Sequence, residues 1–425
     1  MSPRPELLCP AGDAVRLDAA LRYGADAVYL GGRGHSLRPA SLGFDLAQLE
    51  AATAKAAAHG ARVYYCLNAF ARETDLGEVR ETLEALAALA PDGRPAALIV
   101  ADPGVVRLAR RHAPAMPIHL STQANTTSSE AVRFWAELGA SRVNLARELP
   151  LDQLRRIMRA APDMAYEVFV HGAMCLAVSG QCRLSDQLLG RGANRGECAH
   201  PCRYKYRAVG LALEEESRPG EVTWEVLEAG GGFTDILAAE DLCLVPLLAW
   251  FTRNGVAALK IEGRAKSAGY VALVTDVYRA ALADLARGRF RPRLYLDELT
   301  GLGRRALSSG MFLPRRRRWR EAGQAPAREI LARVEAGEAG RFTVAVKALW
   351  DASAPARLLA PGLSRPPLAP GGYRLENALG ERVRLAHPGQ RLTLASEHPG
   401  LGPGLFIQSE PVAQDTLTPV PIPDN

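Results

Sequence analysis

Residues 6–30 read ELLCPAGDAVRLDAALRYGADAVYL, and this stretch contains one complete structural unit. It begins with a short apolar run at Glu6–Cys9, continues as an amphipathic stretch over Asp13–Tyr23 and ends in a second apolar run at Ala27–Leu30. An apolar run, a glycine-containing turn and an amphipathic stretch before a further apolar run are typical of a strand, a helix and a second, parallel strand. The stretch therefore predicts a βαβ unit.

The same alternation continues to about residue 265, and it predicts the fold of the larger part of the chain. We expect strands at Glu6–Cys9, Ala27–Leu30, Arg62–Leu67, Ala97–Val100, Pro117–Leu120, Arg142–Ala146, Tyr166–Val170 and Ala258–Ile261. Helical patterns between them include Asp13–Tyr23, Asp45–His59, Leu76–Leu89, Ser128–Leu138 and Leu151–Ala160. Eight parallel strands alternating with helices close into a TIM-like (β/α)8 barrel, so the expected fold class is α/β.

The chain of 425 residues is longer than one such barrel, which usually needs about 250. We expect a barrel over residues 1–290, with a cysteine-bearing insertion (171–257) after the seventh strand and a helix at Tyr270–Arg287 after the eighth. A helical and basic linker (291–328) follows, with a helical stretch at Asp297–Leu307 and an arginine run at Arg315–Arg320. Short alternating runs with glycine turns then predict a small all-β domain, a β-barrel, at 329–410. A proline-rich tail (411–425) ends the chain.

Composition restricts the compartment and the class of partner. Residues Met1–Glu6 contain no apolar run of signal-peptide length, and no apolar stretch is long enough to span a bilayer, so we expect a cytoplasmic protein. Seven cysteines in the cytoplasm do not predict a disulfide framework. The net charge of +6 suits a polyanionic partner without requiring one.

Polar residues follow most of the predicted strands, where a parallel barrel builds its active site. We expect these strand-end residues to converge on one mouth: Gln123, Asn125, Arg147, Glu148, His171, Glu262 and Arg264. Loops are polar in most proteins, however, and Arg147 with Glu148 could form an ordinary surface ion pair. The joint pattern, rather than any one residue, indicates a site.

Four cysteines lie close together in the predicted insertion: Cys175, Cys182, Cys198 and Cys202, with spacings C-x6-C-x15-C-x3-C. Four thiolates can bind a tetrahedral zinc ion or a four-iron cluster, and the spacing alone leaves both open, together with unmetallated thiols. Two other cysteines, Cys9 and Cys66, lie in apolar strands and are expected in the core. The seventh, Cys243, is a possible substitute ligand.

The sequence around the first cysteine pair resembles a known family. The motif Glu167-x-Phe169-x-x-Gly172-Ala-Met-Cys175-x4-Gly180-x-Cys182 is similar to the signature of the collagenase-like peptidases of unassigned catalytic type, family U32. The flanking motifs Glu6–Asp13, His119–Asn125, Asn194–Cys198 and Leu259–Arg264 also resemble that family. The resemblance covers about residues 5–290.

The resemblance implies a function that the family name does not state. Relatives hydroxylate a tRNA wobble uridine with prephenate, a ribosomal RNA cytidine or a ubiquinone precursor, without oxygen, and bind a 4Fe-4S cluster through four cysteines. It therefore assigns the cluster to Cys175, Cys182, Cys198 and Cys202, with zinc as the alternative metal. The complete cysteine set and the chain length resemble the tRNA branch.

Site roles follow from the motifs and the strand-end pattern together. We expect catalytic residues at Glu167, His171, Arg147, Glu262 and Arg264, and substrate-binding residues at Gln123, Asn125, Glu148, Arg195, Arg203 and Lys260. The expected partners are tRNA, a small dicarboxylate such as prephenate bound by arginines, and a protein partner or second copy of the chain. The run Arg315–Arg320 would contact RNA phosphates or form a solvated linker.

Two other functions remain open at this level. One is a true peptidase, although the sequence contains neither a Gly-x-Ser-x-Gly elbow nor a His-Glu-x-x-His zinc motif. A cysteine peptidase would need a free thiol, and the clustered cysteines are expected to bind a metal. The other is a non-catalytic RNA-binding or assembly protein with a structural cluster.

Overall fold

The computed structural model describes residues 4–37, 42–204, 228–229, 233–234, 240–301, 303, 305–320 and 328–410. The expected proline-rich tail at 411–425 lies outside the described residues, as does most of 205–239 within the predicted insertion. No helix in the described part of the chain is both long and apolar enough to cross a membrane.

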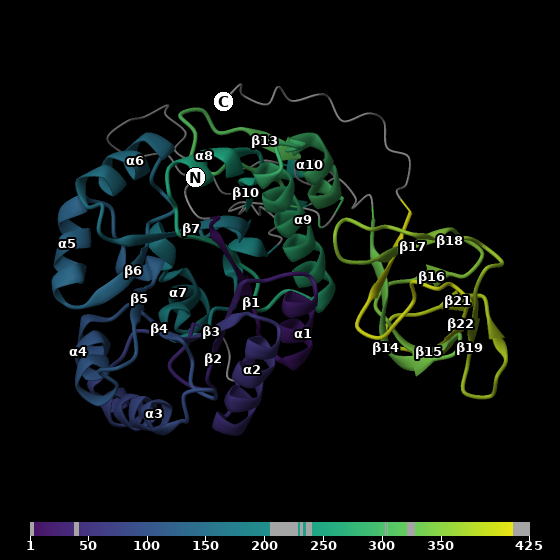
Figure 1. The fold of residues 1–425 in the computed structure, drawn as a ribbon, viewed down its shortest axis with the longest axis horizontal. Coiled ribbons are helices and arrows are strands. Elements are labelled where there is room, and N and C mark those ends of the chain that lie inside the picture. The colour runs from purple at the N-terminus through teal and green to yellow at the C-terminus, as the bar shows by residue number, and fades with distance from the viewer. Residues whose placement is uncertain are drawn as a thin grey trace.

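Eight parallel strands form a closed barrel (Figure 1). They pair in the order β11-β1-β2-β3-β4-β5-β6-β7, and β7 pairs in turn with β11, so the sheet closes on itself. The strands are β1 (Glu6–Pro10), β2 (Ala27–Gly31), β3 (Arg62–Leu67), β4 (Ala97–Val100), β5 (Ile118–Leu120), β6 (Ala140–Asn144), β7 (Ala165–Ala173) and β11 (Ala258–Ile261). Each overlaps a predicted strand, so the predicted barrel is confirmed.

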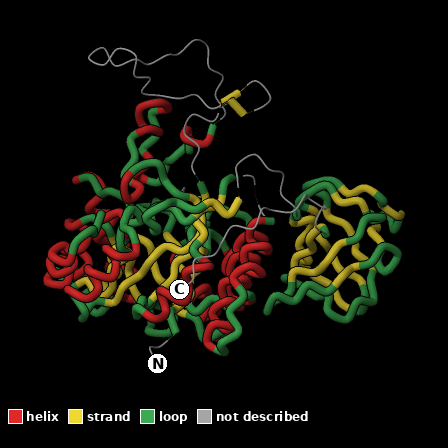
Figure 2. Tube along the Cα trace, turned by 90° about the horizontal axis from the view of Figure 1, so that it is seen from above, coloured by secondary structure: helices red, strands yellow, loops and turns green. Residues whose placement is uncertain are grey.

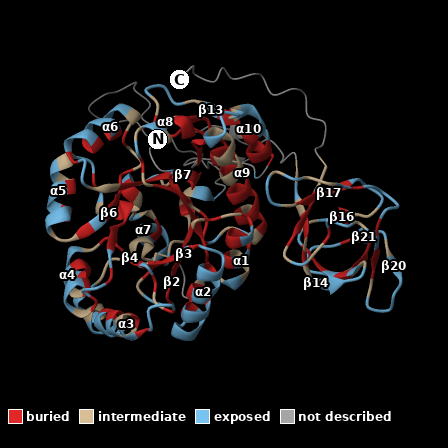
Figure 3. Cartoon of the chain, viewed as in Figure 1, coloured by how far each residue is buried: buried red, intermediate tan, exposed pale blue. Residues whose placement is uncertain are grey.

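Helices form the outer ring, and most bury one face against the strands, whereas α9 is buried on nearly all sides (Figure 3). They are α1 (Ala14–Arg22), α2 (Leu46–Ala58), α3 (Leu76–Ala88), α4 (Pro103–His112), α5 (Ser129–Glu137), α6 (Leu151–Ala160), α8 (Leu248–Arg253) and α9 (Ala268–Ala286). Side chains that accept the third backbone N–H of a helix cap five of them: Asp13, Asp45, Asp102, Ser128 and Ser267. Helix α4 begins at Pro103, because Asp102 caps it and proline fits the first helical position.

The segment after β7 carries the four cysteines through short elements. These are η4 (Val178–Gly180), α7 (Leu184–Leu189), η5 (Ala193–Arg195), η6 (Pro201–Arg203), the hairpin β8 (Glu228–Ala229) and β9 (Phe233–Thr234), β10 (Asp241–Cys243) and η7 (Val245–Leu247). In Figure 1, α7 lies over the centre of the ring of strands. The cysteine segment therefore covers one end of the barrel.

A small extension of the barrel sheet contains the arginine run. β10 pairs antiparallel with β7 and parallel with β12 (Leu307–Ser308), which pairs with β13 (Arg318–Arg320). Trp319 and Arg320 are buried, and Arg318 pairs with Glu240 at 2.8 Å. This part of the run is built into the wall of the barrel and is not a solvated linker.

Helix α10 (Pro292–Thr300) differs from the helix predicted at Asp297–Leu307. Pro292 occupies its first turn, where a missing N–H costs nothing, and the helix ends before Gly301. The predicted bounds were wrong because the glycines at 301 and 303 interrupt the pattern that suggested continuation.

The C-terminal region forms an antiparallel sheet that stands beside the barrel (Figure 2). In sheet order its strands are β18 (Pro367–Leu368), β17 (Ala356–Leu359), β23 (Phe406–Ser409), β14 (Ile330–Glu338), β15 (Arg341–Val346), β22 (Arg391–Ala395), β19 (Arg374–Glu376) and β20 (Arg382–Val383), and β16 (Trp350–Asp351) pairs separately with β21 (Leu385–Ala386). The expected all-β region is confirmed.

Buried ion pairs join this β domain to the barrel helices. Arg365 contacts Asp276 of α9 at 2.8 Å and Glu298 of α10 at 2.9 Å, and Arg357 contacts Glu298 at 3.2 Å. The hydroxyl of Tyr23 donates to the carbonyl oxygen of Leu359 at 2.5 Å. These contacts fix the β domain against the flank of the barrel formed by α1, α9 and α10.

Candidate active site at the barrel mouth

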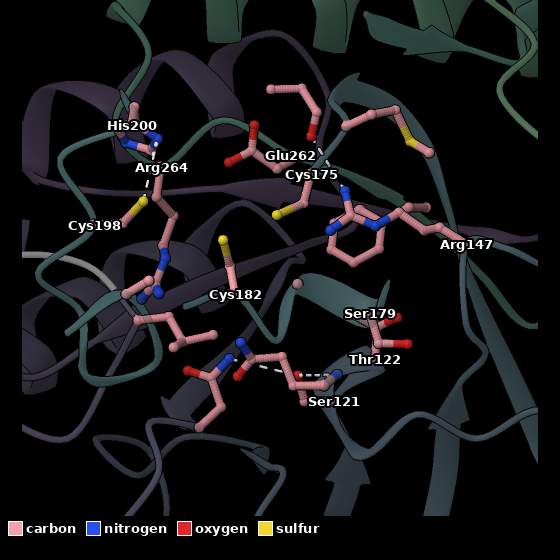
Figure 4. A pocket seen from close by; sticks show the side chains of 18 of the residues that line it. Ser121, Thr122, Arg147, Cys175, Ser179, Cys182, Cys198, His200, Glu262 and Arg264 are labelled. Atoms are coloured by element: carbon pink, nitrogen blue, oxygen red, sulfur yellow. Dashed lines mark hydrogen bonds between the residues drawn. The ribbon is translucent and has the colours of Figure 1, made fainter. Parts of the chain in front are cut away.

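A cavity of about 150 Å³ lies between the carboxyl ends of the strands and the cysteine segment (Figure 4). Its floor comes from side chains that end or follow the barrel strands: Tyr29, Cys66, Asn68, Ile99, Ser121, Gln123, Arg147, Phe169, Lys260, Glu262 and Arg264. Its roof includes Cys175, Ser179, Cys182, Cys198, His200, Cys202 and Arg203. The predicted convergence of strand-end residues is thus present for Gln123, Arg147, Glu262 and Arg264.

All four clustered cysteines line this cavity and are half-buried. Burial raises the pKa of the Cys202 thiol, and the neighbouring thiols of Cys175, Cys198 and Cys182 add to the rise, whereas Arg203 opposes it. The imidazole Nδ1 of His200 lies 3.7 Å from Cys198 Sγ. A cation bound at these sulfurs would offset the cost of ionising Cys202.

The donor set fits an iron–sulfur cluster. The four sulfurs share one cavity but do not converge on one point, since no three His, Cys, Asp or Glu side chains among the described residues lie close enough to hold a single ion. A four-iron cluster requires less convergence, because each of the four thiolates binds a different iron atom. The backbone N–H of Leu184 donates to Cys182 Sγ at 3.4 Å, a contact of the kind that tunes such clusters.

Two arginines and a lysine place positive charge on the cavity floor. Arg264 is only 3% exposed, and its Nη1 has no hydrogen-bond partner in the described part of the chain. Its guanidinium carbon lies 5.8 Å from the ring centroid of Tyr29, and that of Arg147 lies 4.8 Å from the ring centroid of Phe169. A buried guanidinium with an unused donor is costly unless an anion binds it.

Lys260 also reaches the floor, but its charge is already neutralised. Its Nζ lies 2.8 Å from Glu167 Oε1, which also accepts from Asn144 at 2.9 Å. Arg142 lies 3.6 Å from the other Glu167 oxygen. Burial acts to raise the pKa of Glu167, but Lys260 and then Arg142 hold it below its usual value. Glu167 is therefore a buried, ionised partner of Lys260 below the cavity, and it is absent from the cavity lining.

A deeper ion pair continues this arrangement toward the opposite end of the barrel. Arg142 contacts Glu6 at 2.8 Å, and the hydroxyl of Tyr64 donates to Glu6 at 2.8 Å. Burial, and then the charge of Arg142, lowers the pKa of the neighbouring His119 to about 3. The lumen thus contains alternating charges, and among the described residues its balanced pairs leave Arg147 and Arg264 as cations on the cavity floor, below Arg203 of the roof.

Three predicted substrate-binding residues hold the cysteine segment in place. Glu148 accepts from the backbone N–H of Ser179 at 2.8 Å, and Asn125 accepts from the Ser179 hydroxyl at 2.8 Å. Ser179 has a positive φ of 50°, so these two contacts stabilise a strained turn. Arg195 binds Asp75 at 2.6 Å and holds the pKa of that carboxyl well below its usual range.

His171 lies away from the cavity. The pairing of β7 with β11 shifts register between Lys260 and Ile261, so that His171 packs behind the sheet, against α9. Its Nδ1 lies 3.4 Å from the hydroxyl of Tyr278, and burial lowers the pKa of His171 to about 3. The predicted role of His171 as a catalytic residue has no support from this position.

Sequence reasoning missed several floor residues. Asn68 and Ser121 also line the floor, and their positions directly after β3 and β5 were the signal that could have identified them. The buried atoms Asn68 Oδ1 and Gln123 Oε1 have no hydrogen-bond partner among the residues described. Cys9 and Cys66 are buried as expected, while Cys243 is buried beside Tyr278 and does not line the cavity.

The sequence matches known proteins over most of its length. Residues 12–321 match the family model described as peptidase family U32. The tRNA hydroxylation protein P of Escherichia coli K12 is 36% identical over 343 residues, covering 73% of this chain and 74% of that protein. The 23S rRNA 5-hydroxycytidine synthase of the same organism is 35% identical over 67% of this chain and 41% of that protein. A collagenase of Porphyromonas gingivalis is 31% identical over 67% of each.

Proposed function

This chain belongs to peptidase family U32, and from that membership and the residues at the barrel mouth we propose that it is a tRNA-modifying hydroxylase. The proposed target is C5 of the wobble uridine, and the proposed cofactor is a 4Fe-4S cluster on Cys175, Cys182, Cys198 and Cys202. A small dicarboxylate, with prephenate as the candidate, supplies the hydroxyl oxygen. A tRNA substrate would place the protein in the cytoplasm.

The observation that carries this proposal is the meeting of four thiols and two unbalanced guanidinium groups in one cavity. Arg264 has an unused buried donor, and Arg147 lies across the floor from it. Two carboxylates would neutralise these two cations through charge-assisted hydrogen bonds. The cavity therefore suits a dicarboxylic acid held directly below the cysteines.

The side chains have distinct tasks in this arrangement. Arg264 and Arg147 bind and orient the acid, while Lys260 adds positive potential and is fixed by Glu167. Asn68 and Gln123 offer amide groups to the uncharged polar part of the ligand. A bound cluster would supply electron transfer or a Lewis-acidic iron next to the acid. Glu262, half-buried at the rim, is the carboxylate placed to accept a proton from a ligand in the cavity.

The relatives' names favour RNA as the substrate. One relative is named for tRNA hydroxylation and another for making 5-hydroxycytidine in ribosomal RNA, so two RNA hydroxylations occur among proteins 35–36% identical to this chain. The tRNA-named relative matches a larger share of its own length, 74% against 41%. We therefore propose tRNA as the substrate.

The direct test is mass spectrometry of tRNA nucleosides from a deletion strain. We expect C5-hydroxylated wobble uridine, or a modification derived from it, to disappear and to return with the wild-type gene. The Cys198→Ser gene should fail to restore it, and the Cys243→Ala gene should succeed because Cys243 does not line the cavity. Unchanged nucleosides in the deletion strain would refute the proposal.

A second candidate function is a peptidase, and one contact favours it. Cys198 Sγ lies 3.7 Å from His200 Nδ1, which is a thiol beside a possible base, and one relative is named a collagenase. A peptidase of this type should cleave gelatin aerobically, lose activity in a His200→Ala variant and keep it in Cys202→Ser. Binding of tRNA with neither modification nor cleavage would instead indicate a non-catalytic RNA-binding or assembly protein.

A further inference from the structure

A groove of about 640 Å³ separates the barrel from the C-terminal β domain. On the barrel side it is lined by the first residues of α1 and α9, including Arg16 and Gly269, and on the other by residues of the β domain, including Arg333 and Lys347. Figure 1 shows α1 and α9 on the flank of the barrel that faces this domain. The groove is therefore formed only when both parts of the chain are present.

Basic side chains outnumber acidic ones in the lining of the groove. Arg16 pairs with Asp13, Arg328 with Glu298 and Arg333 with Glu335, so Lys347 is the lining cation that no described carboxylate balances. Four basic side chains, Arg16, Arg328, Arg333 and Lys347, face two acidic ones, Asp13 and Glu329. Lys347 is exposed, and the Nε atom of Arg328 is buried without a hydrogen-bond partner among the residues described. Helix α9, with 19 residues and an uncharged serine cap, also directs its N-terminus here. Its dipole adds positive potential at that end.

The groove is continuous with the candidate active site along the chain. Glu262 and Arg264 line the cavity, and Ser267, Ala268 and Gly269, only a few residues later, line the groove. Arg16 Nε donates to the carbonyl oxygen of Lys266 at 2.5 Å, which ties the start of α1 to the same loop. Helix α1 begins after the carboxyl end of β1, and α9 begins after the carboxyl end of β11. The carboxyl ends of the strands form the mouth of the barrel, so the groove opens at the same end of the barrel as the mouth.

The width of the groove is set by packing. A Cβ on Gly269 would lie 3.0 Å from the side chain of Ile330, so the two domains touch closely at the bottom of the groove. The buried contacts of Arg365 with Asp276 and Glu298 hold the same two parts together. A groove fixed in this way presents its charges in a constant arrangement, which lowers the entropy cost of binding an extended anion.

We propose that this interdomain groove binds the sugar–phosphate backbone of the RNA whose target base enters the barrel mouth. The inference rests on the proposed RNA substrate and adds where that RNA is held. Lys347 and Arg333 would contact phosphates, and the N-terminus of α9 would face the same strand of backbone. These contacts position the RNA and carry no base specificity.

The test measures the affinity of the full-length protein for an unmodified tRNA transcript at several salt concentrations. Lys347→Gln, Arg333→Gln and the double variant remove charges from the groove without touching the cavity. We expect about tenfold weaker binding for the double variant and a salt slope smaller by about one for each lost phosphate contact. The iron content and visible spectrum of the anaerobic protein should not change.

The matched control is Arg391→Gln. Arg391 and Arg333 both pair with Glu335, at 3.0 and 2.5 Å, but only Arg333 lines the groove. Equal losses in Arg333→Gln and Arg391→Gln, or an unchanged salt slope in the double variant, would overturn the inference. A polyglutamate peptide gives a second check. If it binds the wild type, binds the groove variants more weakly, and the variants keep full tRNA affinity, the groove binds an acidic protein and the inference is overturned as well.

The outcomes separate this inference from the proposed function. If tRNA binding depends on the groove while the deletion strain keeps its modified nucleosides, the groove stands and the hydroxylation fails. If the modification disappears in the deletion strain but groove variants bind tRNA normally, the hydroxylation stands and the groove fails.

Discussion

Arginines in this protein differ by what their guanidinium groups already bind. Arg195 is occupied by Asp75, and Arg320 by the carbonyl oxygens of Thr300 and Gly303, so both have structural roles. Arg264 is 3% exposed, and its unused donor belongs to a side chain that lines a cavity, which Arg320 does not. The place at the cavity, together with the unused donor, therefore distinguishes Arg264 as a ligand-binding residue.

The first prediction concerns Arg264. Arg264→Gln should weaken binding of the dicarboxylate donor by roughly 100-fold, equivalent to about 3 kcal/mol, because it removes a buried charge partner. Calorimetric titration of prephenate into the anaerobic protein measures this. Arg316→Gln is the control, since Arg316 is exposed and pairs with Glu240 outside the cavity. Equal affinities of the two variants would contradict the assignment.

The second prediction concerns the Lys260–Glu167 pair. In the wild type, the pKa of Glu167 is lower in the folded protein than in the unfolded chain. The pair therefore stabilises the fold fully when the pH is above the pKa of glutamate in the unfolded chain, and this stabilisation is lost as the pH falls through the pKa of Glu167 in the folded protein. Lys260→Met leaves Glu167 buried with the Asn144 amide and the more distant Arg142 charge as its partners, and should reduce the free energy of unfolding by about 3 kcal/mol at pH 7.

Chemical unfolding at several pH values checks this. The deficit of Lys260→Met should shrink toward pH 5, because the unpaired Glu167 can then take up a proton. The double variant Lys260→Met/Glu167→Leu should recover most of the lost stability, since it removes both charges. A deficit that stays constant with pH would show that lost packing, rather than the unpaired carboxylate, causes it.

At the scale of elements, the cysteine segment has little regular structure of its own. It is anchored instead by hydrogen bonds to strand-end loops: Gln181 Nε2 donates to the carbonyl oxygen of Gln123 at 2.6 Å, and the N–H of Phe70 donates to the carbonyl oxygen of Asn194 at 3.0 Å. Asn194 in turn binds the backbone of Cys182 through both of its side-chain ends. The thiols are therefore held at the cavity by the barrel.

The third prediction follows from these anchors. Anaerobically purified protein should contain about four iron and four sulfide per chain, and Cys198→Ser should lose most of both together with the visible absorption. Cys243→Ala, which changes a buried cysteine remote from the cavity, should keep them. Stoichiometric zinc without iron in the wild type would favour the alternative metal.

The elements also show which parts of this protein a sequence can predict. The eight strands were predictable because each is a short apolar run between turns, and the mouth residues were predictable because parallel strands end on one side. The register shift beside Lys260 was not, because it depends on packing between β7 and β11; it directs His171 away from the site. Likewise, no local pattern distinguishes Asn125, which binds Ser179, from Gln123, which faces the cavity.

At the scale of the molecule, the barrel contains the candidate active site and the β domain stands beside its mouth. A small number of buried charges joins the two parts. Glu298 is central, because its Oε1 lies 3.2 Å from Arg357 and 3.7 Å from Arg328, while its Oε2 lies 2.9 Å from Arg365. Burial acts to raise the pKa of Glu298, but Arg365, Arg357 and Arg328 hold it below its usual value. Glu298 is therefore ionised at neutral pH, and its contribution to docking is lost only as pH falls through its lowered pKa.

The last prediction tests whether this docking matters for RNA. Glu298→Gln leaves Arg357 and Arg328 without a carboxylate and Arg365 with Asp276 alone, so it should destabilise the interdomain contact by about 3 kcal/mol and widen the distribution of domain positions. Small-angle scattering should show an increased radius of gyration, and tRNA affinity should fall together with its salt slope.

Glu376→Gln is a matched control, because the Glu376 side chain is also 9% exposed and also pairs with two arginines, Arg341 and Arg374, but all three lie within the β domain. Prephenate binding should be normal in both variants, since neither residue lines the cavity. If Glu298→Gln keeps full tRNA affinity while its scattering profile expands, RNA binding does not depend on a fixed groove between the two domains.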